Sequence, residues 1–127
     1  MKRFILLAFL VVMMILSIST DNCQAKDVWV ERWSSENIDI YVMDDTITSN
    51  SSSENKNFNV SVKNVRNGQL IRVVNWSFYK YKTDSWRYET STMDGTHTTV
   101  VIPQNAIFEF CMNQLGWTYR IQEYWYY

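Results

Sequence analysis

Residues 58–78 read FNVSVKNVRNGQLIRVVNWSF, and this stretch decides the fold. Phe58, Val60 and Val62 alternate with polar side chains, which is the spacing of a β-strand with one buried face. Asn67-Gly68 follows, and this dipeptide is typical of a tight turn between two antiparallel strands. The stretch therefore predicts a long β-hairpin whose returning strand places on one face Leu70, Val74, Trp76 and Phe78.

Two turn geometries give this hairpin different registers. A two-residue turn at Asn67-Gly68 pairs position 60 with 75, which sets an apolar side chain opposite a polar one. A three-residue loop over 66–68, with Gly68 in the left-handed region, pairs 60 with 74 and 58 with 76. Both of these pairs are apolar, so we predict the three-residue loop, with Trp76 opposite Phe58 at the centre of the core.

Shorter strands are predicted on both sides of the hairpin. Upstream, residues 38–47 alternate clearly and residues 28–33 more weakly, with a polar turn between them. Downstream, residues 86–90 and 98–102 are the next candidates. Residues 49–56 contain no apolar side chain, so they are expected to form a solvated loop.

The period of the pattern changes after Pro103. A single helical stripe is formed by Ile107, Phe108, Cys111, Met112 and Leu115. Pro103 suits the first turn of such a helix and Gly116 suits its end. Residues 106–112 also alternate, so a strand is the alternative there. The fold class that follows is α+β: an antiparallel β-meander of five or six strands with one C-terminal helix packed on a face.

The first residues have the order of a secretory signal peptide. Lys2 and Arg3 precede thirteen apolar residues, and small and polar residues follow them. The apolar stretch is shorter than the roughly 20 residues that a membrane-spanning helix needs. Cleavage after Ala25 fits the preference for small residues best, and cleavage after Ser19 is the alternative. We predict a signal peptide over 1–25, a single β-rich domain over 26–127, and a secreted, periplasmic or cell-envelope location.

The cleavage site decides what the cysteines can do. Cleavage after Ala25 removes Cys23 and leaves Cys111 alone, whereas cleavage after Ser19 keeps both and permits one disulfide. Cys111 stands on the apolar stripe of the predicted helix, so we expect it to be buried and unreactive.

The mature residues are nearly balanced in charge, with ten basic and twelve acidic side chains from Lys26 onward. The sequence shows neither the basic stripe expected of a nucleic-acid-binding protein nor a polybasic cluster for anionic lipid. We therefore expect no nucleic-acid partner and no stable membrane insertion of the mature chain. All six tryptophans and all eight tyrosines lie in this part, where core and cross-strand packing is their commonest role.

The segments IDIYVMDDTI (38–47), NVSVKNV (59–65) and WSFYKYKTDSWRY (76–88) resemble those of small, uncharacterised proteins that bacteria secrete. The resemblance covers most of the mature chain and rests on strand patterning. It implies export and a single domain, and it carries over no active site.

No residue pattern points to catalysis, to a metal ion or to a cofactor. His97 is the only histidine, and a catalytic histidine needs a nucleophile or a carboxylate beside it. A buried Cys111 lacks the electropositive, accessible setting of a reactive thiolate. Asp44-Asp45 does not stand in a calcium-binding loop motif. We therefore predict no catalytic residues, no metal site and no enzyme activity.

The remaining prediction is a small exported binding or interaction domain whose partner is a protein or a glycan. The glycan alternative needs exposed aromatic rings that stack on sugars. Four tryptophans lie on segments with poor separation of apolar and polar faces and are the candidates for this role: Trp29, Trp33, Trp117 and Trp125.

Overall fold

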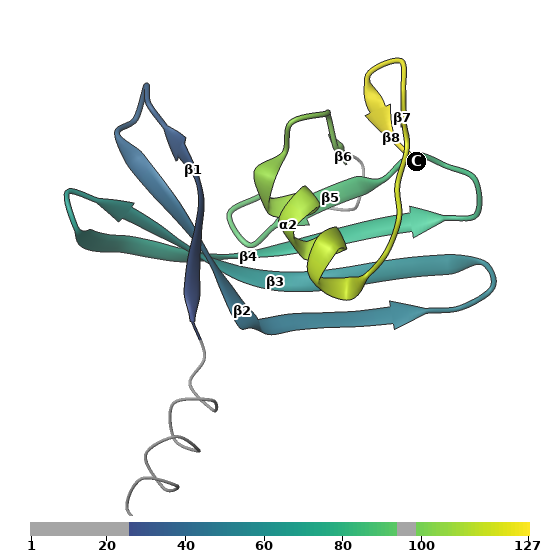
Figure 1. Cartoon of the computed structure of the whole chain (residues 1–127), viewed down its shortest axis with the longest axis horizontal. Helices are drawn as coiled ribbons and strands as arrows, with labels where there is room; N and C mark the ends of the chain where they lie inside the picture. The colour runs from purple at the N-terminus through teal and green to yellow at the C-terminus, as the bar shows by residue number, and fades with distance from the viewer. Residues whose placement is uncertain (1–25, 94–98) are drawn as a thin grey trace, which may run out of the picture.

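The computed structural model describes residues 26–93 and 99–127 (Figure 1). Six strands form one antiparallel sheet in which neighbours in sequence are neighbours in space. They are β1 (Asp27–Trp33), β2 (Ile38–Ser51), β3 (Asn55–Arg66), β4 (Gln69–Tyr81), β5 (Arg87–Thr90) and β6 (Thr99–Val100). A short helix, α2 (Ala106–Leu115), comes next, and β7 (Ile121–Gln122) and β8 (Trp125–Tyr126) form a small C-terminal hairpin. The predicted meander and the short helix near the C-terminus are confirmed.

The sheet curls strongly along its length. Figure 1 shows β1 and the first part of β2 crossing in front of the β3–β4 hairpin. The loops at that end are joined by hydrogen bonds, from Asn37 Nδ2 to Asn67 Oδ1 at 3.3 Å and from Arg66 Nη2 to the carbonyl of Glu36 at 3.0 Å. We call the side of the sheet that carries the buried residues the inner face and the other side the outer face.

The β3–β4 hairpin forms as predicted, but its predicted register is wrong. The turn has two residues, Asn67 at φ 51° and Gly68 at φ 77°, and Arg66 pairs directly with Gln69. Positive φ at both central positions matches the right-handed twist of the flanking strands. A bulge on β4 between residues 70 and 72 then shifts the register, so that Phe58 lies opposite Phe78 and not opposite Trp76. The bulge achieves the apolar pairing that a longer turn was expected to provide.

The bulge also changes which side chains of β4 lie inside. Val74 and Phe78 are buried, but Leu70 precedes the bulge and is 56% exposed, which corrects its predicted place on the inner face. Trp76 is half-buried at the margin of the core. The centre of the core is instead occupied by Trp86, which is 1% exposed and follows the sharp turn after β4.

The expected loop over 49–56 is mostly strand. Ser49, Asn50 and Ser51 pair with Phe58, Asn57 and Lys56, and only residues 52–54 make the turn. The backbone ladder of a hairpin needs no apolar side chains when both faces at its tip are exposed. The composition of residues 49–56 therefore predicted their exposure to solvent correctly, but it did not predict that most of them form strands.

The predicted helix is confirmed over Ala106–Leu115, and the strand alternative is wrong. Asn105 caps the helix, because its Oδ1 accepts a hydrogen bond from the Phe108 amide at 2.9 Å. Gly116 ends it in the left-handed region at φ 69°. Four helical residues are buried: Ile107, Phe108, Cys111 and Met112. The Phe108 ring lies 5.9 Å from that of Phe58 and 5.5 Å from that of Phe78.

The end of the chain is tied to the core. The amide of Trp86 donates to the carbonyl of Tyr126 at 2.9 Å, and the Tyr126 side chain is fully buried. Its hydroxyl donates to Glu109 Oε1 on α2 at 3.0 Å. Among the described residues, no helix has the length and apolar character that crossing a membrane requires.

Candidate functional site

An open hollow of about 290 Å³ lies on the inner face near the turn of the β3–β4 hairpin. Three aromatic residues from three strands line it: Trp33 of β1, Trp76 of β4 and Tyr88 of β5. Asn64 of β3 and Arg72 of β4 add polar groups to its wall. We call this site the tryptophan hollow. Its wall is about evenly divided between apolar and polar residues, since Glu36 and two threonines also line it.

The meander brings the two neighbouring aromatic residues of the hollow together. Trp76 pairs with Thr90, and Phe78, the next inward-facing residue of β4, pairs with Tyr88. The rings of Trp76 and Tyr88 therefore lie side by side on the inner face. Their centroids are 5.2 Å apart with planes 24° from parallel, and the Trp76 ring also stacks on Phe78 at 5.8 Å. This stacking fixes the orientation of Trp76 and leaves part of its ring exposed.

Trp33 reaches the hollow because the sheet curls. It ends β1, opposite Ile38 and next to the β1–β2 turn. Its Nε1 donates to Glu31 Oε1 at 2.7 Å, which fixes the indole ring in one orientation. The polar edge of Trp33 is thus paired within the chain, and its apolar surface lines the hollow.

Asn64 is the most informative residue of the site. It continues the inward-facing series Phe58, Val60 and Val62, and it is 3% exposed, the one buried polar residue in the described part of the chain. Within residues 26–93 and 99–127, no hydrogen bond joins the side-chain amide of Asn64 to another group of the protein, and no fully enclosed polar side-chain atom lacks a partner. The amide therefore opens onto the hollow that Asn64 lines.

Because the polar atoms of the Asn64 amide reach the open hollow, solvent can pair with them when no ligand is bound. An apolar residue at position 64 would continue the core pattern but would offer no hydrogen bond to a molecule in the hollow. The sequence contains the signal, since Asn64 is the polar member of an otherwise apolar inward-facing series, but our reading of the sequence did not single it out.

Charged groups stand at the entrance of the tryptophan hollow. Glu36 belongs to the β1–β2 turn and Arg72 follows the β4 bulge, and both are exposed. Glu36 can accept hydrogen bonds from a molecule in the hollow, and Arg72 can donate them.

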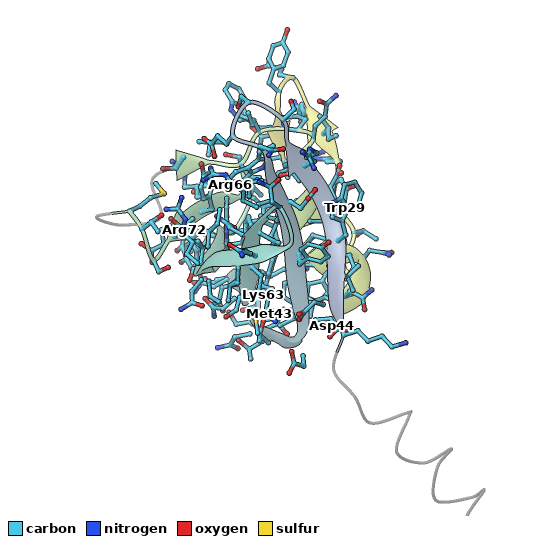
Figure 2. The ribbon with its side chains drawn as sticks, turned by 90° about the vertical axis from the view of Figure 1, so that its left-hand side faces the viewer. Trp29, Met43, Asp44, Lys63, Arg66 and Arg72 are labelled. Atoms are coloured by element: carbon cyan, nitrogen blue, oxygen red, sulfur yellow. The ribbon has the colours of Figure 1, made fainter. Side chains whose placement is uncertain are left out.

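The four tryptophans predicted for glycan binding lie in different places. Only Trp33 lines the tryptophan hollow. Trp29 is 53% exposed on the outer face, where its Nε1 donates to Asp39 Oδ1 at 3.1 Å. Figure 2 shows Trp29 and Arg72 on different sides of the molecule. Trp117 is half-buried with its ring 6.2 Å from Phe58 and 6.3 Å from Trp86.

Trp125 completes the set and is 36% exposed on the C-terminal hairpin. In the described ranges, the ring contacts of Trp117 lead into the core and none joins two of these four tryptophans. The structure therefore does not bring the four predicted rings together in one place. It combines one of them with Trp76 and Tyr88, which the sequence analysis did not select as ligand-binding residues.

The structure describes two of the residues that the sequence analysis considered for catalysis or metal binding, Cys111 and Asp44. Cys111 is fully buried, which confirms the prediction, and burial raises the pKa of its thiol to about 12. The thiol is therefore protonated at neutral pH, and a protonated thiol is a poor nucleophile. Asp44 accepts a hydrogen bond from the amide of Lys26 at 3.2 Å. His97, Cys23 and the predicted signal peptide lie outside the described residues.

No protein-family model, curated protein or solved structure matches the chain. The assignment of a function therefore rests on the geometry of the tryptophan hollow and on the chemistry of its walls.

Proposed function

We propose that the mature domain is a non-catalytic binding module and that the tryptophan hollow holds a sugar ring of a glycan. The observation that carries the proposal is Asn64, a nearly buried polar residue that lines the hollow together with Trp33, Trp76 and Tyr88. Its side-chain amide makes no hydrogen bond within the described chain, so its donor and its acceptor are available to a ligand.

The walls of the hollow suit the two kinds of surface that a sugar ring presents. One face of a pyranose carries C–H groups, which pack on the exposed surface of an aromatic ring. Its hydroxyl groups both donate and accept hydrogen bonds, as the amide of Asn64 does. Arg72 donates and Glu36 accepts at the entrance. The volume of about 290 Å³ lies at the lower end of the range for ligand sites, which favours a small ring over a large cofactor.

In this proposal α2 is packed on the inner face and leaves the tryptophan hollow open beyond it. The ring contacts of Phe108 with Phe58 and Phe78 support this arrangement. The helix then stabilises the sheet, and the curled end near Asn67-Gly68 is free to bind.

We also propose that the domain acts outside the cytoplasm, in the cell envelope or in the surroundings of the cell. The support is the order of charged, apolar and small residues at the start of the sequence. Glycans are abundant ligands in these compartments.

Screening the secreted protein on an array of soluble glycans tests the binding function. We expect retention of a subset of glycans by the wild type and loss of binding in Asn64→Leu. The variant should fold with similar stability, because leucine continues the apolar inward-facing series of β3 and no hydrogen bond within the described chain is lost. Loss of binding without loss of stability separates this role from a structural one.

Trp29→Ala is the matched control, since it removes an exposed tryptophan from the outer face. It should leave glycan binding unchanged. The proposal is wrong if no glycan is retained, or if Trp29→Ala abolishes binding while Asn64→Leu preserves it.

A further inference from the structure

A second hollow, of about 410 Å³, lies at the opposite end of the β3–β4 hairpin from the Asn67-Gly68 turn. Four basic side chains line it: Lys56 at the start of β3, Lys80 near the end of β4, Lys82 just after β4, and Arg120 before β7. We call it the cationic hollow. Its other wall residues include Tyr119 and Thr118.

The sheet places two of these charges face to face. Lys56 and Lys80 are direct partners in the β3–β4 register. Like charges directly opposite each other destabilise a sheet. Burial lowers the pKa of Lys80, and the charges of Lys56 and Arg120 lower it further, as expected where positive potential accumulates.

The basic side chains are held by aromatic neighbours. Lys56 Nζ lies 5.5 Å from the centre of the Trp117 ring, and Lys82 Nζ lies 5.2 Å from that of Tyr81. The Arg120 guanidinium lies 5.4 Å from the ring of Tyr127. Such contacts attract a cation without neutralising its charge.

Acidic side chains do not balance this cluster. Among the acidic side chains that the structure describes, the one that pairs with it is Glu54, 3.8 Å from Lys82, and both partners are more than half exposed. The carboxyl group of Tyr127 accepts a hydrogen bond from the backbone amide of Arg120 at 3.0 Å. Within the described ranges, Lys56, Lys80 and Arg120 have no ion-pair partner within 4 Å. The mature chain has fewer basic than acidic residues, so the cluster does not reflect an excess of lysine and arginine.

We propose that the cationic hollow binds a tetrahedral oxyanion, a phosphate or sulfate group carried by a larger molecule. Lys56, Lys80 and Arg120 are the direct partners of its oxygens, and Lys82 adds charge at the rim. Hydrogen bonds from ammonium and guanidinium groups to such oxygens are among the strongest in proteins. A bound oxyanion also offsets the repulsion between Lys56 and Lys80, which gives the otherwise unfavourable pairing a function. This site is separate from the tryptophan hollow and does not depend on the function proposed there.

Titration calorimetry of the secreted protein with inorganic phosphate and with inorganic sulfate, at constant ionic strength, tests the site. We expect saturable binding of at least one of them and weakening by about tenfold in Lys80→Gln, the equivalent of one lost charge-assisted hydrogen bond. Lys80→Gln should fold well, because it removes a like-charge contact. Its melting temperature without added anion should equal or exceed that of the wild type.

Lys63→Gln is the matched control, because it removes the same charge from β3 but on the outer face, where Lys63 pairs with Asp27 at 2.6 Å. It should leave oxyanion binding unchanged, and so should Asn64→Leu. The proposal is overturned if neither anion binds saturably. It is also overturned if Lys63→Gln weakens binding as much as Lys80→Gln.

Three probes distinguish the possible carriers of the oxyanion: glucose 6-phosphate, a sulfated oligosaccharide, and phosphatidylcholine vesicles containing phosphatidylglycerol. The carrier that uses this site should bind the wild type, be displaced by the inorganic anion and bind Lys80→Gln about tenfold more weakly. A probe that binds Lys80→Gln as tightly as the wild type binds outside the cationic hollow. If all three probes behave in this way, the proposal that the oxyanion is carried by a larger molecule is wrong.

Discussion

Trp86 is the largest fully buried side chain in the described part of the chain, and it contacts three other core rings. Its ring lies 5.3 Å from that of Phe108, 5.6 Å from that of Phe58 and 6.3 Å from that of Trp117. Truncation of a buried aromatic costs about 3–5 kcal/mol, against the 5–15 kcal/mol that a domain of this kind has. We therefore expect Trp86→Ala to be unfolded or barely stable in urea denaturation.

Two further tryptophan variants test this ranking. Trp76→Ala should lose less stability than Trp86→Ala, because Trp76 is half-buried. Trp125→Ala should change the free energy of unfolding little, since its ring is 36% exposed. Equal losses in Trp86→Ala and Trp125→Ala would show that the core is centred elsewhere.

Tyr126 makes stability depend on alkaline pH. Burial, together with the hydrogen bond to Glu109, raises the pKa of its hydroxyl from the ordinary value of 10 to about 12. The folded state thus holds this proton more tightly than the unfolded state, so the stabilisation is complete below pH 10 and is lost as the pH rises through 12.

Urea denaturation of the wild type and of Tyr126→Phe between pH 7 and pH 11.5 measures this effect. At neutral pH the variant should lose about 1.5–3 kcal/mol, the range for a hydrogen bond to a charged group. Its stability should then fall less steeply above pH 10, and the remaining slope should include Cys111, whose pKa is also raised by burial. Parallel curves for the two proteins would assign the alkaline loss to other groups.

At the scale of the element, the β3–β4 hairpin depends on the backbone of its turn. Gly68 has φ 77°, and a methyl group added there meets no other atom within 4 Å. Gly68→Ala therefore tests conformational strain alone, and we expect a loss of about 1–2 kcal/mol in the free energy of unfolding. Asn67→Gly is the control, because glycine adopts φ 51° without strain; it loses only the exposed hydrogen bond from Asn37 at 3.3 Å, so it should cost less than Gly68→Ala. A neutral Gly68→Ala would indicate that the hairpin accepts another turn.

The same hairpin shows how an element places functional residues. The bulge after Leu70 returns Arg72, Val74 and Trp76 to the inner face, next to Asn64. At the far end, the uninterrupted register sets Lys56 opposite Lys80. The bulge shifts the β3–β4 register from Asn64 to the far end of the hairpin, so it determines which side chains meet at both hollows.

At the scale of the whole molecule, the predicted export fixes where the mature chain begins. Cleavage after Ala25 gives a first residue Lys26, whose backbone nitrogen donates to Asp44 Oδ1 at 3.2 Å. We expect N-terminal sequencing of the secreted protein to start at Lys26. A start at Thr20 would retain Cys23, and a start at Met1 would contradict the signal peptide.

The sequence by itself determined the classes of structure in this protein. Alternation over 38–47 and 58–63, the Asn-Gly turn and the helical stripe ending at Gly116 are local patterns, and each predicted its element correctly. The burial of Cys111 followed from its place on that stripe. These features depend on residues that are close together in the chain, so their physical causes can be read from spacing alone.

Only the tertiary structure decided the register and the two hollows. The bulge at residues 70–72 and the central position of Trp86 depend on how β4 fits β3 and the helix, which no local pattern contains. The tryptophan hollow combines Trp33, Asn64 and Trp76, which lie on three different strands. The cationic hollow likewise gathers basic residues from three segments of a chain whose charge is nearly balanced. Both sites arise because a curled antiparallel sheet brings distant residues together, and that proximity is a property of the fold.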